Sequence, residues 1–327
     1  MGATAWLVEE PGGAFRKIEL SHTPLREKQV RVRIAAAGVN PLDTKIRAAK
    51  AAHAKQPLPA VLGLDMAGTV EEVGPGITAF KQGDEVYGMV GGVGGLQGTL
   101  AQSIDVDADL LAHKPKNLSM REAAALPLVV ITSWEALMDH AKVHEGQSVL
   151  IHAGAGGVGN VAVQMARAHG ANVFATVSEG KRAIVEGLGA TAIDYRAASI
   201  AQYVEEHTGG RGFDVVFDTV GGTTLDACFL AVKPYTGRVV SALGWGTHSL
   251  APLSFRAATY SGVFTLMPLL SGENRVHHGQ ILGQAAALVQ AGKLRPLLSQ
   301  EQFSPENIDA AYARVESGSL GKVVIEM

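Results

Sequence analysis

Gly154-Ala155-Gly156-Gly157-Val158-Gly159 is the stretch that decides the fold of this chain. It follows an apolar run typical of a strand, 148–152, and it opens a helical pattern of apolar residues that ends near Gly170. Glycines at this spacing allow a tight turn, a close approach of the backbone to a pyrophosphate, and close packing of helix on strand. Because a further strand is expected at 172–177, the sequence predicts a βαβ unit that binds a dinucleotide. The alternative is a glycine-rich turn that binds nothing.

The residues after the second predicted strand indicate which dinucleotide is bound. A site for NAD usually places Asp or Glu there, about 20 residues after the glycines, to bind the ribose 2′-hydroxyl. This chain has Ser178 instead, followed by Glu179 and Lys181. A hydroxyl and a cation suit a 2′-phosphate, whereas a carboxylate would repel it. We therefore expect NADPH rather than NADH. Two alternatives stay open: Glu179 turns inward, or Lys181 faces solvent on the next helix.

Composition favours a cytoplasmic enzyme. The 327 residues are enough for two domains with cores of their own, and the formal net charge is -3 without a basic block. Nucleic acid and anionic membranes are therefore not expected as partners. Cys228 is the single cysteine, so no intrachain disulfide is possible and a reducing compartment is indicated. We see no charged-then-apolar leader and no apolar run of about 18 residues, which would be needed to span a membrane.

The first third of the chain is predicted to be rich in β-strands. Short runs of apolar and β-branched residues alternate with turns that contain Gly and Pro. These runs are 4–9, 29–34, 68–73, 83–89 and 100–106. Regular short strands of this kind indicate a small barrel. Ser119 and Glu122 then have the spacing of a capping box and predict a helix at 119–125, and a second helix is expected at 132–140.

Beyond residue 148 the hydrophobic pattern alternates between strand and helix. This alternation predicts a doubly wound parallel sheet of six strands in an α/β fold. The expected strands are 148–152, 172–177, 191–194, 213–218, 238–242 and 261–266, with helices at 181–188, 200–208 and 223–231. The tail, with a helix at 280–291 and a strand at 321–326, is expected to rejoin the first domain. We thus expect one domain at 1–121 and 268–327, and another at 122–267.

Six motifs spread along nearly the whole chain belong together. They are 37–47, 62–68, Leu126-Pro127 with 132–137, the glycine stretch 154–159, 193–196 and 218–222. In this combination they resemble the medium-chain dehydrogenase/reductase superfamily, and within it the zinc-free quinone oxidoreductase branch that includes zeta-crystallin. The resemblance implies a GroES-like catalytic domain of β-barrel type and a Rossmann domain, with the substrate bound between them.

The positions of zinc ligands in this superfamily carry other residues here. Zinc alcohol dehydrogenases have a Cys after an early barrel strand and Gly-His-Glu in the second motif. In this chain Val39 and Asn40 occupy the first region, Leu64 and Asp65 replace His and Glu, and the cysteines of a structural lobe are missing. Without Cys or His ligands a tetrahedral catalytic zinc is not expected. The expected reaction therefore shifts from alcohol oxidation to NADPH-dependent reduction of a quinone or an α,β-unsaturated carbonyl.

The resemblance also assigns roles to single residues around the cofactor. The pyrophosphate would be held by Gly154, Gly156, Gly157, Val158 and Gly159. The 2′-phosphate would be surrounded by Ser178, Lys181 and Tyr195. The nicotinamide and the floor of the cleft would be lined by Val220, Gly221, Leu243, Gly244 and Phe264. Asn40 and Thr132, the latter opening its helix, match residues beside the nicotinamide ribose.

Three of these positions are candidates for catalysis: Asn40, Lys45 and Thr132. Asn40 offers a donor to a substrate carbonyl, whose oxygen gains negative charge as hydride arrives. Lys45 stands where many relatives have Tyr, and it either contacts a quinone oxygen or faces water. No residue stands out as a general acid, so we expect the final proton to come from solvent.

Other functions and the assembly remain open at this point. A 2-enoyl thioester reductase would need a basic groove for a phosphopantetheine arm, and no cluster of Arg or Lys clearly builds one. A crystallin-type protein would bind NADPH with little turnover, and metal analysis would identify a zinc alcohol dehydrogenase. An apolar edge strand at 261–267 predicts a homodimer, because strand edges invite pairing.

Overall fold

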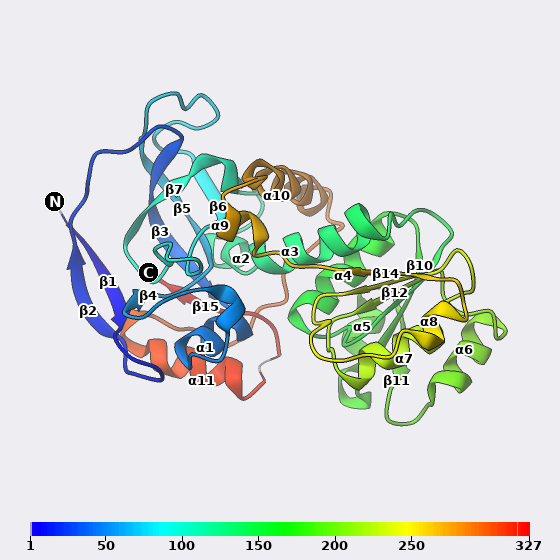
Figure 1. The fold of residues 1–327 in the computed structure, drawn as a ribbon. Coiled ribbons are helices and arrows are strands. Elements are labelled where there is room, and N and C mark those ends of the chain that lie inside the picture. The colour runs from blue at the N-terminus through cyan, green and yellow to red at the C-terminus, as the bar shows by residue number, and fades with distance from the viewer. Residues whose placement is uncertain (1, 319) are drawn as a thin grey trace. The chain divides into compact units, whose positions relative to one another are not determined.

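Two units make up the fold of this computed structural model, which describes residues 2–318 and 320–327 (Figure 1). The first unit comprises the chain up to Leu128 together with Leu266–Gly292 and Pro296–Met327. The second unit comprises Val129–Thr265 and Lys293–Arg295. The tail thus returns to the first unit, apart from a short segment before residue 296.

The first unit is built on antiparallel strands. One sheet has the order β2-β1-β4, and a larger one has the order β15-β3-β5-β6-β8, with β7 also paired to β3. The strands are β1 (Ala3–Val8), β2 (Arg16–Leu20), β3 (Gln29–Val39), β4 (Ala60–Val61), β5 (Asp65–Val73), β6 (Glu85–Met89), β7 (Ser103–Asp107), β8 (Leu111–His113) and β15 (Val323–Glu326). The predicted strands of the first third are confirmed, with β3 and β5 longer than the sequence indicated.

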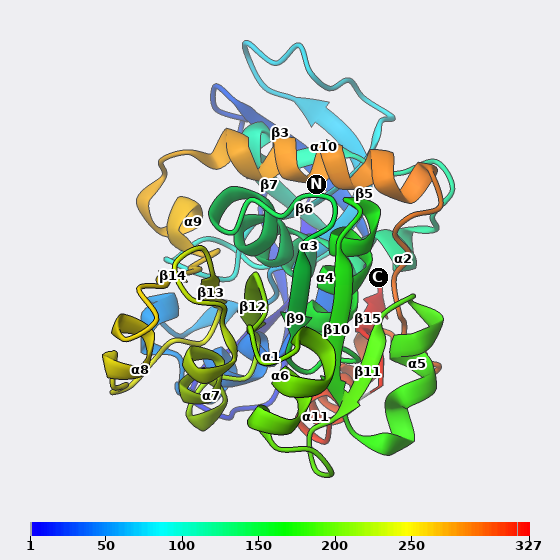
Figure 2. The same ribbon diagram turned by 90° about the vertical axis from the view of Figure 1, so that its right-hand side faces the viewer.

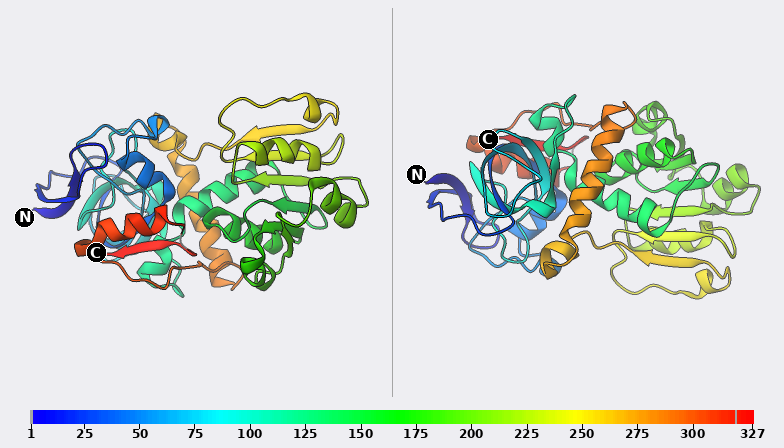
Figure 3. Two further views of the ribbon diagram at one scale, coloured as in Figure 1. Left: turned by 90° about the horizontal axis from the view of Figure 1, so that it is seen from below. Right: turned by 90° about the horizontal axis from the view of Figure 1, so that it is seen from above.

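Helices cover this strand framework. Figure 3 shows α11 beside the C-terminal strand β15, and the two elements are in contact. The helices of the unit are α1 (Pro41–Arg47), α2 (Met120–Ala124), α9 (Met267–Ser271), α10 (Arg275–Gln290) and α11 (Ile308–Glu316). Ser119 caps α2, because its hydroxyl accepts a hydrogen bond from the Glu122 backbone N–H, as the capping-box spacing predicts. The strand β15 pairs with β3, which confirms that the tail rejoins the first part of the chain.

The second unit is a doubly wound sheet, and all of its strand pairs are parallel. Figure 2 shows the strands side by side in the order β11-β10-β9-β12-β13-β14. The strands are β9 (Ser148–Ile151), β10 (Asn172–Val177), β11 (Thr191–Asp194), β12 (Val215–Asp218), β13 (Arg238–Ser241) and β14 (Thr259–Gly262). The chain runs outward from β9 in one direction and then continues from β12 in the other. The carboxyl ends of β9 and β12 therefore form the switch point at which such sheets bind ligands.

Helices connect these strands and bury the apolar faces of the sheet. They are α4 (Gly157–Ala168), α5 (Arg182–Gly187), α6 (Ile200–Thr208), α7 (Thr223–Ala231) and α8 (Ala251–Ser254). One core cluster joins Leu150 and Val216 of the sheet to Phe229 of α7, each at most 1% exposed. Cys228 belongs to the same cluster and is a buried free thiol, as expected of a small core residue.

Three local predictions are wrong. The helix expected at 280–291 is α10, Arg275–Gln290, and begins five residues earlier. The helix expected at 132–140 begins earlier, as α3 (Pro127–Trp134), because proline is well accommodated in the first turn of a helix. Thr132 therefore lies inside the helix instead of opening it, and Glu135–His140 continues as a π-helix. The edge strand expected at 261–266 is β14, Thr259–Gly262, whose register follows from its pairing with β13. Residues 263–266, most of them apolar, were predicted as part of the strand but come after its end.

No helix among residues 2–318 and 320–327 has the length and apolar character that crossing a membrane requires.

Candidate cofactor-binding site

The glycine turn between β9 and α4 is closely packed against its surroundings. A Cβ atom on Gly154 would lie 2.5 Å from the Cβ of Ala175 in β10. A Cβ atom on Gly159 would lie 2.1 Å from the carbonyl oxygen of Ala153. Only glycine fits at these two positions. This agrees with the close packing of helix on strand that the glycine motif implies. Gly156, the N-cap of α4, and Gly157, its first residue, are exposed, so the start of this helix is accessible to an anion.

A pocket of about 710 Å³ opens beside this turn in the second unit. It brings together residues predicted to bind different parts of the cofactor: Gly156, Ser178, Lys181, Tyr195 and Val220. Further lining residues come from the ends of the strands and from α6 and α7, among them His152, Thr176, Ser199, Tyr203, Thr223 and Thr224. The pocket is large enough for the adenosine part of a dinucleotide, and it lies at the carboxyl ends of the strands.

The corner of the pocket around Ser178 is rich in groups that suit an anion. Ser178 is half-buried, Lys181 is exposed, and Tyr195 is 52% exposed with the guanidinium of Arg196 5.5 Å from its ring centre. Glu179 does not line the pocket. Its carboxylate accepts hydrogen bonds from Nε of Arg182 at 2.9 and 3.1 Å, and this ion pair holds it on its own helical turn. Of the two open alternatives, an inward-facing Glu179 is therefore wrong.

A buried carboxylate organises the loops after β12 and β13. Asp218 accepts hydrogen bonds from the backbone N–H groups of Val220 at 3.0 Å and Gly221 at 2.9 Å, and from the Ser241 hydroxyl at 2.7 Å. These bonds bring the two loops together, so that a Cβ atom on Gly221 would lie 2.6 Å from the carbonyl oxygen of Leu243. Val220, Gly221 and Leu243, which were all predicted near the nicotinamide, are thus neighbours. Asp218 was part of a motif, but its role in holding the loops was not predicted.

The other residues predicted near the nicotinamide lie close to the end of the same sheet. The rings of Trp245 and Phe264 meet edge to face at 6.1 Å, and a Cβ atom on Gly244 would lie 2.0 Å from the hydroxyl oxygen of Tyr260. Thr132 is buried, and its hydroxyl is 3.0 Å from that of Thr265, the residue next to Phe264. Thr265 in turn donates to the carboxylate of Glu135 at 3.1 Å.

His152 is a pocket residue that sequence reasoning missed. It follows β9 directly, is 5% exposed, and has its Nδ1 atom 3.1 Å from the Thr176 hydroxyl. Burial lowers its pKa to about 4, against the opposing effect of Asp218, so the imidazole is neutral at physiological pH. A single histidine at the end of a strand carries no spacing signal, and only the lining of the pocket reveals it.

In the first unit, Asn40 lies in a buried polar cluster. Its backbone N–H donates to the carboxylate of Asp43 at 2.7 Å, and its side-chain amide donates to Asp65 at 2.9 Å. The ammonium group of Lys322 donates to the Asn40 amide oxygen and lies 3.7 Å from Asp65. Burial raises the pKa of Asp43 to about 7 and that of Asp65 to about 6. Lys45, by contrast, is exposed on α1.

The groups at the superfamily's zinc positions do not fit a zinc ion. Leu64 offers no ligand atom, and Asp65 already accepts from the Asn40 amide and from the backbone N–H of Leu128 at 3.0 Å. A cation would also have to share Asp65 with the ammonium of Lys322. In the described part of the chain, no group of three or more His, Cys, Asp and Glu residues is arranged to hold a metal ion.

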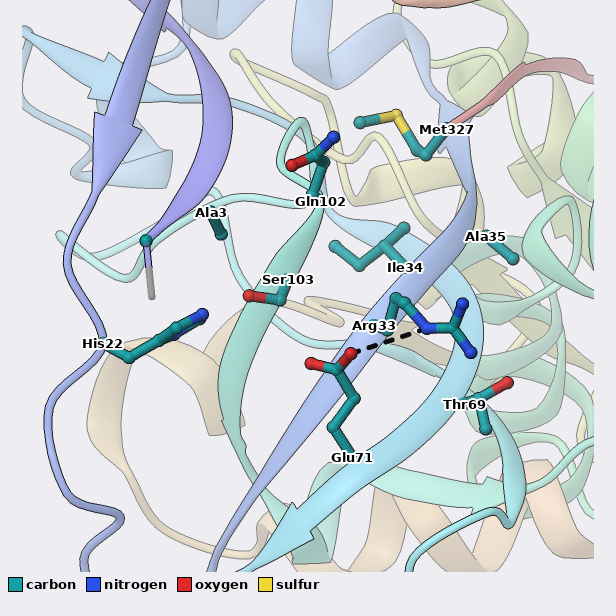
Figure 4. Close-up of a pocket in the computed structure, with 11 residues that line it drawn as sticks. Ala3, His22, Arg33, Ile34, Ala35, Thr69, Glu71, Gln102, Ser103 and Met327 are labelled. Carbon is teal, nitrogen blue, oxygen red and sulfur yellow. Dashed lines mark ion pairs between the residues drawn. The ribbon is translucent and has the colours of Figure 1, made fainter.

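Another pocket, of about 490 Å³, lies in the first unit (Figure 4). Figure 4 shows Arg33 and Glu71 facing each other across it, with Nε of Arg33 3.5 Å from Oε1 of Glu71. The charges of Arg33 and Glu71 largely cancel each other, and none of the lining residues is one that the sequence predicted to bind cofactor or substrate. The pocket beside the glycine turn is therefore the candidate site.

Comparison with known proteins places these observations in a family. The model "Alcohol dehydrogenase GroES-like domain" matches residues 26–116, and the model "Zinc-binding dehydrogenase" matches residues 188–325. The name of the second model refers to zinc, but its match does not include the zinc-ligand positions discussed above, Leu64 and Asp65, which lie within the first match.

Curated relatives and a solved structure match over most of the chain. A 2-methylene-furan-3-one reductase from Solanum lycopersicum is 36% identical over 310 residues, covering 92% of this chain and 72% of the relative. A chloroplastic NADPH-dependent alkenal/one oxidoreductase from Arabidopsis thaliana is 34% identical, with coverage of 98% and 78%. The crystal structure of an alcohol dehydrogenase superfamily protein from Novosphingobium aromaticivorans is 54% identical, with a TM-score of 0.97 and coverage of 99% of both chains.

Proposed function

The chain belongs to the medium-chain dehydrogenase/reductase superfamily and is an oxidoreductase, and from this premise we propose that it is a zinc-independent, NADPH-dependent reductase of α,β-unsaturated carbonyls or quinones. The observation that carries the proposal is the pocket beside the glycine turn, which Ser178 and Lys181 both line and to which no described Asp or Glu contributes. When bound, NADPH supplies the hydride; the chain's own residues bind, orient and polarise.

The preference for NADPH rests on charge. A ribose 2′-phosphate carries up to two negative charges, and Lys181 with the nearby Arg196 would attract it. Glu179 is neutralised by Arg182 and so does not oppose it. The Arabidopsis relative is named as NADPH-dependent, which supports the same cofactor here.

The acceptor class rests on what the site lacks and on the relatives. Without a Lewis acid at Leu64 and Asp65, the site is poorly equipped to form an alkoxide from a simple alcohol. An activated double bond takes hydride at its β-carbon and needs only hydrogen-bond donors at the carbonyl oxygen. Two relatives are named for enone and alkenal substrates, so we place enones first and quinones second. Asn40 is the proposed donor to the carbonyl oxygen, and Lys45 on α1 is a further candidate.

The test is a stopped-flow experiment on cofactor oxidation. NADPH and NADH are each mixed with but-3-en-2-one and with 1,4-benzoquinone, with and without EDTA. We expect fast oxidation of NADPH that EDTA leaves unchanged, and deuterium on the β-carbon of the saturated ketone when the cofactor is deuterated at C4. Loss of activity with EDTA would overturn zinc independence. Micromolar NADPH binding without turnover of any acceptor would instead favour a cofactor-binding protein of crystallin type.

We also propose that the protein is a cytoplasmic homodimer joined through β14. This strand is at the edge of the parallel sheet, so one side of its backbone has no strand partner among residues 2–318 and 320–327. Two aromatic side chains near this edge, Phe255 and Tyr235, are 88% and 82% exposed and are available to a partner. Light scattering that reports a monomer would end this idea.

A further inference from the structure

The ends of three neighbouring strands meet at Asn40. Asn40 follows β3, Asp65 begins β5, and Lys322 precedes β15, in a sheet where β3 lies between the other two. All three side chains are buried: Asn40 is 1% exposed, Asp65 0% and Lys322 7%. Asp43, the carboxylate that caps the turn after Asn40, is 1% exposed as well.

The charges around Asn40 determine which way its amide points. An amide group has an acceptor at Oδ1 and two donors at Nδ2, and the two ends have nearly the same shape. Here the ammonium of Lys322 is in contact with one end and the carboxylate of Asp65, 2.9 Å away, with the other. An ammonium group can only donate, and an ionised carboxylate can only accept. The reverse orientation would set donor against donor and acceptor against acceptor.

One hydrogen of the Asn40 amide is used by Asp65, and its second hydrogen then has a defined direction. If the amide turned over, the same position would present an acceptor, which would repel the oxygen of a carbonyl that gains negative charge. The orientation of the Asn40 amide is therefore important if Asn40 donates a hydrogen bond to the acceptor. It would matter little if the side chain only filled space.

We propose that Lys322 is a positioning residue, whose buried ammonium holds the Asn40 amide in the orientation that donates a hydrogen bond to the acceptor's carbonyl oxygen. The inference rests on the proposed function and deepens it. Lys322 does not touch the acceptor; it acts through Asn40, with Asp65 as the second anchor. A buried cation beside two carboxylates is a costly arrangement, and a hydrophobic residue would stabilise the sheet as well.

The experiment compares variants of the full-length protein. Lys322→Met alone would leave buried carboxylates without a cation and endanger folding. The informative variant is therefore Lys322→Met with Asp65→Asn, which removes the ammonium and the carboxylate that faces it, keeps the side-chain sizes and retains an acceptor for the Leu128 N–H. Asn40→Ala and the triple variant complete the set. Lys114→Met is the matched control, because Lys114 is also a buried lysine of this unit, bound to the carbonyl oxygens of Pro115 and Leu118.

We expect kcat for but-3-en-2-one to fall about 10- to 100-fold in the double variant and in Asn40→Ala. The triple variant should lose no more than Asn40→Ala alone, since Lys322 acts through Asn40. Fluorescence titration should give an NADPH Kd within twofold of the wild type in all of them, and Lys114→Met should keep its kcat. A double variant that retains kcat while Asn40→Ala loses it would overturn the proposal, and so would losses that multiply in the triple variant.

A second readout does not depend on turnover. The side-chain amide protons of Asn40, identified in NMR spectra by their absence in Asn40→Ala, should be separate and slow to exchange in the wild type. They should exchange rapidly in the double variant. If the wild type reduces no acceptor, the proposed function fails, and these signals still decide whether Lys322 orients Asn40. Unchanged signals in the double variant would refute the orienting role.

Discussion

Replacing Ser178 with aspartate should reverse the cofactor preference. The substitution places a carboxylate where dinucleotide sites for NAD carry one, in a pocket corner that the structure lines with Lys181 and Tyr195. A bound 2′-phosphate would face that carboxylate, whereas the ribose 2′-hydroxyl of NADH could donate to it. The same change should therefore harm one cofactor and help the other.

The size of the effect follows from the exposure of the site. Two unit charges 4 Å apart interact by about 1 kcal/mol in water and about 4 kcal/mol at an effective dielectric constant of about 20. Ser178 is half-buried beside the exposed Lys181, so the repulsion lies in the lower part of this range. With a phosphate charge approaching about -2, we expect about 2 kcal/mol, or about 30-fold in kcat/KM for NADPH. A hydrogen bond to the carboxylate should raise kcat/KM for NADH by roughly threefold to tenfold.

The assay is kcat/KM for NADPH and NADH at a fixed acceptor concentration, measured at low and high salt. We expect the ratio to change by about 100-fold in Ser178→Asp and by less at about 0.5 M salt, where exposed charges are screened. Ser178→Ala separates loss of the hydroxyl from addition of the charge. Glu179→Gln is the control, because Arg182 holds Glu179 away from the pocket, and its ratio should stay within about threefold. A Ser178→Asp enzyme that keeps its NADPH preference would refute the reasoning.

Three further predictions concern packing, pH and metal. Gly154→Val should lower Tm by several degrees, because its Cβ would lie 2.5 Å from that of Ala175. Gly187→Ala is the control: its Cβ would have nothing within 4 Å, so Tm should stay unchanged or rise. Thermal melts of both variants test this. His152 has a folded pKa of about 4 against 6.5 unfolded, so its contribution to stability is complete above pH 6.5 and is lost as pH falls through 4. Urea melts should therefore show the wild type losing up to about 3 kcal/mol more than His152→Gln over that window, and parallel pH curves would contradict it. Dialysis against EDTA should leave both Tm and activity unchanged, and a loss restored by zinc would contradict the assignment of the zinc positions.

Much of the second unit could be predicted from the sequence because its signals are local. The strand Thr191–Asp194 and the helices Ile200–Thr208 and Thr223–Ala231 have the predicted bounds. For Ile200–Thr208 the cause is visible, since Ser199 caps its start and Gly209 ends it with a positive φ of 58°. Where the apolar run continued past the strand, as after β14, periodicity could not locate the end, because that is set by pairing with β13.

The candidate site shows the same division between local and distant information. Ser178 and Lys181 stand close to the glycine motif in the sequence, so their neighbourhood followed from one βαβ unit, and the pocket contains both. His152 gave no signal, although it is next to the motif, because its burial and its bond to Thr176 depend on the neighbouring strand β10. Composition and spacing show which residues are close together in the sequence. They do not show which strands lie side by side in the fold, and therefore which strand ends are neighbours.

Asn40 is the clearest case, and it bears on how the chemistry of this branch is to be understood. From the sequence, Asp65 is only a residue in place of a zinc ligand, and Lys322 is a cation in the expected C-terminal strand. The fold joins them across the Asn40 amide, although Lys322 and Asn40 are 282 positions apart. The carboxylate that stands at a zinc-ligand position of the superfamily thus faces the ammonium group of Lys322 in this protein. If Lys322 orients Asn40 as proposed, positive charge still acts on the acceptor's oxygen in this protein, but it does so through a hydrogen bond of fixed direction and not through a metal–oxygen bond.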